Sequence, residues 1–191
     1  MKSLCVFCGS SAGNHPGYLE TARLLGSKLA QRGVTLVYGG GRVGLMGAMA
    51  DAALREGGQV IGVIPQLLFD KEVGHSGLTQ LHVVDSMAER KQFMGDLSDA
   101  FLTLPGGIGT LDELFEAWTW TQLGLHDKPC GLLNQEGYYD PLLAFLDRCV
   151  TEGFLRPRYR AALWVDTDLQ RLLDKLAATG AKPEENSGRS L

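Results

Sequence analysis

Short runs of apolar residues alternate along the chain with amphipathic stretches that have the period of a helix. The apolar runs, which we expect to be strands, lie at residues 4–7, 35–38, 60–64, 81–84, 100–104 and 131–133. The helical patterns between them lie near residues 16–32, 44–56, 86–98, 110–124 and 140–152. Near-continuous apolar strands separated by helices are typical of a parallel sheet that is covered on both faces. The pattern therefore predicts a Rossmann-like α/β fold, with a doubly wound parallel sheet in a single domain.

Local signals mark where several helices begin. The capping-box pattern, a hydroxyl residue followed three positions later by Glu or Gln, occurs at residues 86–89 and 167–170. Asp140 followed by Pro141 fits an N-cap residue and a proline in the first helical position. We therefore expect helices to start at these three places.

The end of the chain has a different composition from the rest. Residues 180–191 contain Pro, Glu, Asn, Ser and Gly and almost nothing apolar, so they cannot bury enough surface to fold. We expect residues 1–179 to form the domain and residues 180–191 to form a disordered tail.

Composition and charge narrow the class of partner. The chain has 191 residues, of which 45% are hydrophobic and 21% charged, as in an ordinary globular protein. A net charge of −4 and the lack of any basic run argue against nucleic acid as a partner. No signal peptide is evident, and no apolar stretch approaches the roughly 20 residues that span a bilayer. We therefore expect a cytoplasmic protein that binds small molecules.

Two of the four cysteines, Cys5 and Cys8, form a C-x-x-C pair, which could indicate redox chemistry or half of a zinc site. Cys5 lies within an apolar run, the chain has no second C-x-x-C, and its four histidines are scattered. In a cytoplasmic protein such cysteines are reduced, and a free cysteine is usually a small buried hydrophobe. We therefore expect no metal site here.

Three loops that follow predicted strands are rich in glycine or serine: residues 9–13, 39–44 and 105–110. Ligands bind such sheets beyond the carboxyl ends of the strands, so these loops are expected to form one site. Glycines before a helix leave free N–H groups at the positive end of the helix dipole, which suits a phosphate. Packing at crowded turns is the alternative reason for single glycines.

The second of these loops also matches a dinucleotide-binding pattern. Gly39, Gly41 and Gly44 have G-x-G-x-x-G spacing, but residues 60–65, the next strand, do not end in the acid that would bind ribose. A nicotinamide-dependent oxidoreductase is therefore a minor alternative. The chain has no Gly-Lys-Ser/Thr and hence no Walker A motif.

Carboxylates follow the third loop within a helical run. Thr110 and Glu113 have the spacing of a capping box, so Glu113 could simply cap the helix. The apolar positions of this helix form a core stripe made of Leu111, Leu114, Phe115 and Trp118. Glu113, Glu116 and Trp120 fall on a neighbouring face, as expected for the wall of a site beside a phosphate loop.

Arg90 is unusual because its own helical face is apolar, with Met87 three residues before it and Met94 four residues after. An arginine in this position must either extend to solvent or meet an anion. Lys91 is next to it and is a more ordinary surface residue.

Taken together, these segments resemble a known family. Residues 87–91 read M-A-E-R-K and residues 105–113 read P-G-G-I-G-T-L-D-E. They are similar to the paired R-K and PGGxGTxxE signature of the Lonely Guy family of cytokinin riboside 5′-monophosphate phosphoribohydrolases. The similarity covers most of the chain up to about residue 180. Relatives have also been labelled lysine decarboxylases, although we find no pyridoxal-phosphate lysine motif in this sequence.

The resemblance implies a hydrolase that cleaves the N-glycosidic bond of N6-modified adenosine 5′-monophosphates, or of AMP itself, and needs no cofactor or metal. The products are the free base and ribose 5-phosphate. Arg90 and Glu113 correspond to the catalytic pair. The residues that correspond to substrate contacts are Glu72, Arg90, Lys91, Gly106, Gly107, Ile108, Gly109, Thr110, Leu111, Asp112 and Thr119. The resemblance also implies a homodimer.

The chemistry agrees with these residues. Cleavage of a ribosyl C–N bond builds oxocarbenium character, which a carboxylate such as Glu113 can stabilise while it orients or deprotonates water. Arg90 could hold the phosphate or position Glu113, and the sequence leaves both roles open. A nucleotide-binding protein without catalysis is the main alternative function.

A homodimer has weaker support from the residues themselves. Arg90 lies on an apolar helical face, and residues 118–125 carry two tryptophans and two leucines, more apolar surface than one core stripe needs. Burial of both helices within a single subunit is an equally good explanation.

Overall fold

Seven parallel strands form one sheet, in the order β4-β3-β2-β1-β5-β6-β7. The computed structural model describes residues 1–72 and 74–179. The strands are β1 (Ser3–Phe7), β2 (Thr35–Tyr38), β3 (Val60–Pro65), β4 (Gln80–Val84), β5 (Ala100–Thr103), β6 (Cys130–Leu133) and β7 (Leu163–Asp166). The predicted Rossmann-like α/β fold is confirmed. Six of these strands coincide with the predicted apolar runs, whereas β7 was not predicted because it is a half-exposed edge strand that ends in an aspartate.

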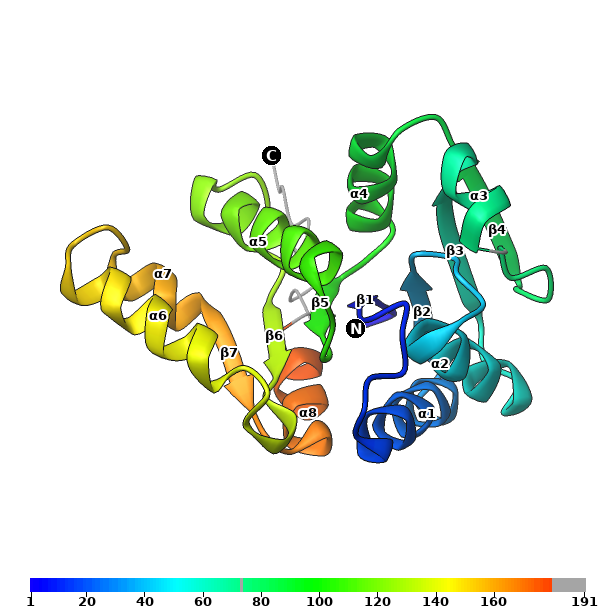
Figure 1. Cartoon of the computed structure of the whole chain (residues 1–191), viewed down its shortest axis with the longest axis horizontal. Helices are drawn as coiled ribbons and strands as arrows, with labels where there is room; N and C mark the ends of the chain where they lie inside the picture. Colours follow the sequence, from blue (N-terminus) through cyan, green and yellow to red (C-terminus); the bar gives the residue numbers. More distant parts are fainter. Residues whose placement is uncertain (73, 180–191) are drawn as a thin grey trace, which may run out of the picture.

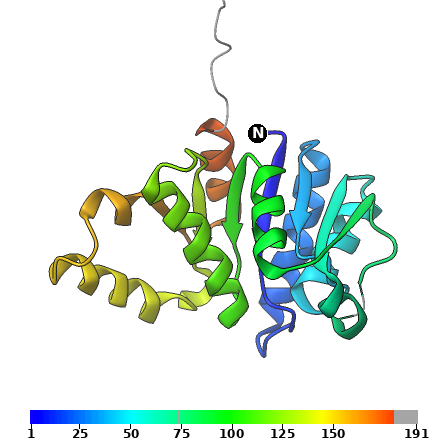
Figure 2. The same cartoon turned by 90° about the horizontal axis from the view of Figure 1, so that it is seen from above.

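Helices cover both faces of the sheet, as Figure 1 and Figure 2 show. One face carries α1 (Pro16–Gln31), α2 (Gly44–Arg55) and α8 (Leu169–Thr179). The other face carries α4 (Met87–Asp96), α5 (Ile108–Leu123), α6 (Asp140–Thr151) and α7 (Pro157–Ala162). The short helix α3 (Gln66–Glu72) follows β3, and a 3₁₀ turn (Gln135–Gly137) follows β6.

The central strand β1 is buried on both faces because two separate apolar cores lie against it. Leu4 and Val6 belong to the core beneath α1, α2 and α8. Cys5 and Phe7 point the other way, into the core beneath α4, α5 and α6. Alternate residues of a strand face opposite sides, so an unbroken apolar run is what a doubly covered strand requires.

The order of the strands fixes the place where a ligand can bind. The chain adds β2, β3 and β4 on one side of β1 and then returns to place β5 on its other side. The loops that leave β1 and β5 therefore diverge to opposite sides of the sheet. In open α/β sheets the crevice at this switch point, beyond the carboxyl ends of the strands, is the usual ligand site.

The predicted helix starts are close to those observed, with two corrections. At α4 the hydroxyl of Ser86 accepts from the backbone N–H of Glu89 at 3.1 Å, which confirms Ser86 as the N-cap. At α8 the predicted cap, Thr167, is wrong by one residue, because Asp168 accepts from the backbone N–H of Arg171 at 2.8 Å. At α6 the N-cap is Tyr139, so Asp140 is the first helical residue rather than the cap.

Two further predictions concern the C-terminal tail and membrane-spanning segments. The tail predicted for residues 180–191 lies outside the described residues. In the part of the chain that the structure describes, no helix has both the length and the apolar character needed to cross a bilayer.

Candidate active site

The three glycine-rich loops meet at the switch point and are bonded to one another. The backbone N–H of Gly9, after β1, donates to the carbonyl of Pro105, after β5, at 3.1 Å. The N–H of Leu45, at the start of α2, donates to the carbonyl of Gly9 at 3.2 Å. Gly44 must be a glycine here because its φ is 63° and a Cβ would collide with the backbone of Ser10. Segments far apart in the sequence thus form one edge.

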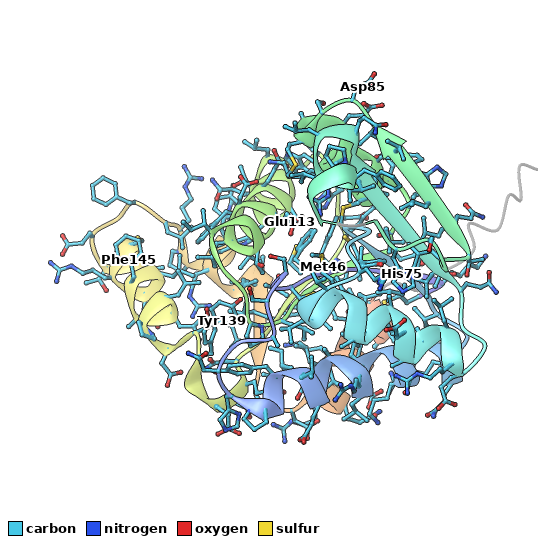
Figure 3. All side chains as sticks on the ribbon, turned by 45° about the vertical axis from the view of Figure 1, so that its right-hand side comes forward. Met46, His75, Asp85, Glu113, Tyr139 and Phe145 are labelled. Atoms are coloured by element: carbon cyan, nitrogen blue, oxygen red, sulfur yellow. The ribbon has the colours of Figure 1, made fainter. Side chains whose placement is uncertain are left out.

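A cavity of about 220 Å³ opens between these loops and the helices α4 and α5. Figure 3 shows Glu113 and Met46, which both line this cavity, close together near the centre of the molecule. The cavity is lined by Val6, Cys8, Gly9, Ser10, Gly39, Met46, Met87, Arg90, Gly107, Ile108, Gly109, Thr110 and Glu113. Six of the predicted site residues are among them: Arg90, Gly107, Ile108, Gly109, Thr110 and Glu113.

Arg90 and Glu113 face each other across this cavity. The Nη2 atom of Arg90 lies 3.6 Å from Oε1 of Glu113, and the two residues are only 6% and 9% exposed. Arg90 comes from the first turn of α4, and Glu113 from the second turn of α5. A buried carboxylate and a buried guanidinium this close together each offset part of the other's cost of burial.

The guanidinium of Arg90 also contacts the loop after β2. Nη2 donates to the carbonyl of Gly39 at 3.3 Å, and Nη1 lies 3.7 Å from the sulfur of Met87. The Nε–H group is buried and has no acceptor among the described residues. A buried donor without an acceptor is costly, which suits a group that binds a ligand oxygen. Of the two outcomes expected for this arginine, the structure shows that it meets an anion.

The first turn of α5 presents backbone N–H groups to the cavity. The N-cap is Gly107, and the first bond of the helical ladder runs from the N–H of Leu111 to the carbonyl of Gly107 at 3.1 Å. The N–H groups of Ile108, Gly109 and Thr110 precede this ladder and therefore lack helical acceptors. Together with the helix dipole they favour an anion at this end of the cavity.

The position of this first turn also decides between the two interpretations of Glu113. The helix begins at Ile108, so Glu113 lies too far along it to return to the N-terminal amide in a capping box. The alternative in which Glu113 is a simple cap is wrong. Its carboxylate instead reaches the cavity and Arg90.

The cysteines of the C-x-x-C pair are buried free thiols, and Cys8 lines the cavity. Burial raises the pKa of Cys8 well above its ordinary value, and the nearby carboxylate of Glu113 raises it further. Burial does the same to the pKa of Cys5. Both thiols are therefore neutral and unreactive at physiological pH. No cluster of three or more potential metal ligands occurs within residues 1–72 and 74–179.

Lys91 does not line the cavity. Its Nζ atom lies 3.0 Å from Asp112 and 3.0 Å from Glu116, and so joins α4 to α5. Burial alone would lower the pKa of Lys91, but the two carboxylates outweigh it and the net shift is upward. Lys91 and Asp112, both predicted to contact substrate, are thus paired with each other in this structure.

The remaining predicted contacts lie at different places. Gly106 lines a second cavity of about 270 Å³ beside the first. Leu111 is half-buried in the core with α5, and Thr119 is exposed two turns further along that helix. The side chain of Glu72, the last residue of α3, lies outside what the structure describes.

Two tyrosines that the sequence analysis missed hold the third glycine-rich loop, residues 105–110, in place. The hydroxyl of Tyr139 donates to the carbonyl of Leu104 at 2.8 Å, and that of Tyr138 donates to the carbonyl of Gly106 at 2.8 Å. Burial raises the pKa of Tyr139, so its hydroxyl remains a donor. The only sequence signal was a Tyr-Tyr pair after a buried strand, and it does not specify the acceptors.

Fold and cavity together define a Rossmann-like protein whose cavity holds a buried carboxylate and guanidinium. Residues 46–176 match the sequence profile of a family described as "Possible lysine decarboxylase". The chain is 49% identical over 175 residues to a cytokinin riboside 5′-monophosphate phosphoribohydrolase of Arabidopsis thaliana, covering 92% of this chain and 82% of that protein. It is also 49% identical over 170 residues to the enzyme of the same name from Rhodococcoides fascians, covering 88% and 86%. The chain therefore belongs to the Lonely Guy family, as the signature motifs predicted.

Solved structures with the same fold include more distant proteins. A molybdenum cofactor binding protein from Rippkaea orientalis aligns with a TM-score of 0.70 and 22% identity, covering 93% of this chain and 97% of that one. The molybdenum cofactor carrier protein from Chlamydomonas reinhardtii aligns with a TM-score of 0.66 and 22% identity, covering 92% and 98%. At this identity the likeness shows the fold alone.

Proposed function

We propose that this protein is a phosphoribohydrolase that cleaves the N-glycosidic bond of N6-modified adenosine 5′-monophosphates, and of AMP itself. The products are the free base and ribose 5-phosphate. The observation that carries the proposal is the buried pair of Arg90 and Glu113, which shares a cavity with the amides of an α-helix N-terminus. Relatives that are 49% identical are named for this reaction on cytokinin riboside 5′-monophosphates.

The amides at the start of α5 provide a place for the 5′-phosphate. Gly107, Ile108, Gly109 and Thr110 line one end of the cavity, and their N–H groups lie at the positive end of the helix dipole. A phosphate held there is remote from the bond that breaks. Its binding energy serves to align the ribose with Glu113, which raises the rate of reaction rather than only the affinity.

Glu113 acts on the sugar. As the C1′–N9 bond breaks, positive charge develops on C1′ and O4′, and the carboxylate stabilises this charge. The same carboxylate orients a water molecule and accepts its proton as the water oxygen bonds to C1′. The departing base takes up a proton from solvent, and Glu113 then releases to solvent the proton that it accepted. Arg90 lies 3.6 Å from the carboxylate of Glu113 and fixes the direction in which it points.

A nucleotide-binding protein without catalysis would need the anion site but not the charge pair. Burying Arg90 and Glu113 beside an otherwise apolar wall of Val6 and Met46 costs desolvation energy. Because a phosphate binds well to helix amides alone, this cost is best explained by chemistry on the sugar. The nicotinamide alternative stays weaker, since β3 ends at Pro65 without an acid to bind a ribose hydroxyl.

We also propose that the protein is a homodimer. Part of the predicted apolar surface is used within the subunit, because Trp118 is buried and donates to the carbonyl of Tyr159 at 2.9 Å. Leu123 and Leu125, at the end of α5, are 65% and 69% exposed. Ile108, at the mouth of the cavity, is 89% exposed. A partner subunit would cover these apolar side chains.

Light scattering at assay concentration tests the dimer. A mass near twice the 20.7 kDa of the chain is expected. A mass near 20.7 kDa together with full activity would show that one subunit is sufficient. A cytoplasmic location remains a prediction from the sequence.

One assay tests the proposed reaction. Purified protein is incubated with AMP and with isopentenyladenosine 5′-monophosphate, and the products are separated by chromatography. We expect free base and ribose 5-phosphate in equal amounts, with the same yield in the presence of EDTA. Binding of both nucleotides without release of base would favour the non-catalytic alternative.

A further inference from the structure

The direction of the Arg90 guanidinium depends on the loop that follows β2. Its Nη2 atom donates to the carbonyl of Gly39 at 3.3 Å and lies 3.6 Å from Oε1 of Glu113. The guanidinium packs directly on the Cα of Gly39, where any Cβ would overlap it. A shift of this loop would therefore move the guanidinium relative to Glu113.

The loop itself rests on a segment that lies outside the cavity. The carbonyl of Gly40 accepts from the backbone N–H of His75 at 3.0 Å, and Gly41 forms an isolated antiparallel bridge with Gly74. Behind the loop, the hydroxyl of Tyr38 donates to the carbonyl of Gly41 at 3.1 Å. Residues 74–75 thus support the loop from the side that faces away from β1.

The ring of His75 fixes this supporting segment. His75 is 7% exposed, and its Nε2 atom lies 3.1 Å from Oδ1 of Asp51 on α2. Its Nδ1 atom accepts from the backbone N–H of Gly77 at 3.2 Å. Because Nδ1 is an acceptor, the ring proton lies on Nε2 and is donated to Asp51. Figure 3 shows His75 beside α2, beyond Met46 as seen from Glu113.

Both nitrogens of the ring are used within the fold, and His75 does not line the cavity. The same α2 that carries Asp51 begins at Gly44, directly after the loop. The bond between His75 and Asp51 therefore ties the supporting segment to the helix into which the loop leads. Together they hold the loop from both sides.

We propose that His75, anchored by Asp51, is a positioning residue for the phosphoribohydrolase reaction, which acts by fixing Gly39 and through it Arg90. The proposal rests on the function proposed above. The phosphate site at the start of α5 has no bond to this segment among the described contacts, so loss of the anchor leaves that phosphate site unchanged. Loss of the anchor moves Arg90 relative to Glu113 and therefore lowers kcat.

Substitutions of Asp51 provide the cleanest test, because its side chain is 56% exposed and its removal leaves the core unchanged. Asp51→Ala removes the acceptor for the Nε2–H group, whereas Asp51→Asn keeps an oxygen that can accept it. Leu176→Ala is the control for general destabilisation, since it leaves a hole in the core beneath α8, on a helix that contributes nothing to the cavity.

We expect kcat for the nucleotide to fall about tenfold to a hundredfold in Asp51→Ala, with KM changed less than about twofold. Asp51→Asn should retain most of the wild-type kcat, and Leu176→Ala should retain it despite a lower melting temperature. An unchanged kcat in Asp51→Ala, or a rise in KM alone, would overturn the proposal.

Amide hydrogen exchange tests the same anchor without reference to activity. In Asp51→Ala the peptides that cover residues 39–46 and 74–77 should exchange faster than in the wild type, while Leu176→Ala should leave them unchanged. If these peptides exchanged equally fast in Asp51→Ala and in the wild type, Asp51 would not anchor the segment. This result is independent of whether the protein releases base. Failure of the wild type to release base would count against the proposed function alone.

Discussion

The guanidinium of Arg90 lies 3.6 Å from the carboxylate of Glu113. The helices that carry them, α4 and α5, are also joined by Lys91, the residue next to Arg90. The inner pair lines the cavity, whereas the outer contact of Lys91 with Asp112 and Glu116 does not. One carboxylate on α5 is thus available to a substrate, and its neighbours serve the packing of two helices. This division of roles leads to separate predictions for each group.

The first prediction concerns Glu113. Replacing it with Gln keeps the shape and a hydrogen-bond acceptor for Arg90 but removes the charge and the proton-accepting oxygen. We expect kcat to fall by about 10² to 10⁴, the usual range for loss of general acid–base catalysis. The melting temperature should also fall, because the buried guanidinium of Arg90 loses the charge that offsets its burial. Initial rates of base release measure this directly.

Glu116→Gln is the matched control, because Glu116 lies almost one turn further along α5 and pairs with Lys91 outside the cavity. Its kcat should stay within about twofold of wild type. Near-normal turnover in Glu113→Gln would show that the mechanism given for this residue is wrong.

The second prediction concerns Lys91. If Lys91 joins α4 to α5 rather than binding substrate, Lys91→Met and Glu116→Gln should each lower the free energy of unfolding. The double variant should be little less stable than Lys91→Met, because that substitution already removes the contact with Glu116. Partners in one network couple by about 0.5 kcal/mol or more, so urea unfolding of the four proteins resolves the coupling. A KM that rises about tenfold in Lys91→Met alone would instead make it a substrate contact.

The third prediction concerns the two tyrosines that bond to the loop between β5 and α5. Tyr139→Phe leaves the buried carbonyl of Leu104 without its donor, which should lower the free energy of unfolding by about 1–3 kcal/mol. Tyr138→Phe is the control, because Tyr138 is 43% exposed and water can replace its bond to Gly106. Equal losses in the two variants, measured by urea unfolding, would show that burial of the carbonyl does not matter.

The fourth prediction is a pH dependence at the edge of the sheet. The side chain of Arg171 and the backbone N–H of Asp168 lower the pKa of Asp166 from 3.8 to about 2. A carboxylate whose pKa is lower in the folded state stabilises the fold above its unfolded pKa, and that contribution is lost as the pH falls through the folded pKa. The melting temperature of Asp166→Asn should therefore lie below that of wild type at neutral pH.

That difference should shrink between about pH 4 and pH 2, as the carboxylate of Asp166 takes up a proton. Thermal unfolding followed by circular dichroism at several pH values gives the comparison. A difference that stays constant down to pH 2 would mean that the ion pair with Arg171 does not stabilise the fold.

The sequence alone was sufficient for most of the fold. Residues 4–7 and 100–104 are unbroken apolar runs because β1 and β5 are covered on both faces, and this pattern is visible without any structure. The half-exposed strand β7 and the short helices α3 and α7 lack that pattern, so they were missed. The glycine-rich loops were predicted to form one site, and the structure shows that they meet, because few other residues allow such close turns.

The candidate site was less predictable wherever it depends on contacts between distant segments. An arginine on an apolar helical face indicated that Arg90 either extends to solvent or meets an anion. Its contact with the carbonyl of Gly39, 51 residues away, could not be predicted. Lys91 was expected to contact substrate from the family resemblance, and its ion pairs with Asp112 and Glu116 could not be predicted because those carboxylates come from a different helix. Tyr139 bonds to the backbone carbonyl of Leu104, and the backbone N–H of His75 bonds to the carbonyl of Gly40. Contacts with backbone atoms cannot be predicted from the pattern of side chains.

The central claim is that a phosphate bound at the start of α5 aligns the sugar with Glu113, and the most direct measurement compares a nucleotide with its nucleoside. We would measure kcat/KM for isopentenyladenosine 5′-monophosphate and for isopentenyladenosine under identical conditions. Two charge-assisted hydrogen bonds to the phosphate, at about 2 kcal/mol each, predict a value about a thousandfold lower for the nucleoside. Comparable values for the two compounds would contradict the account.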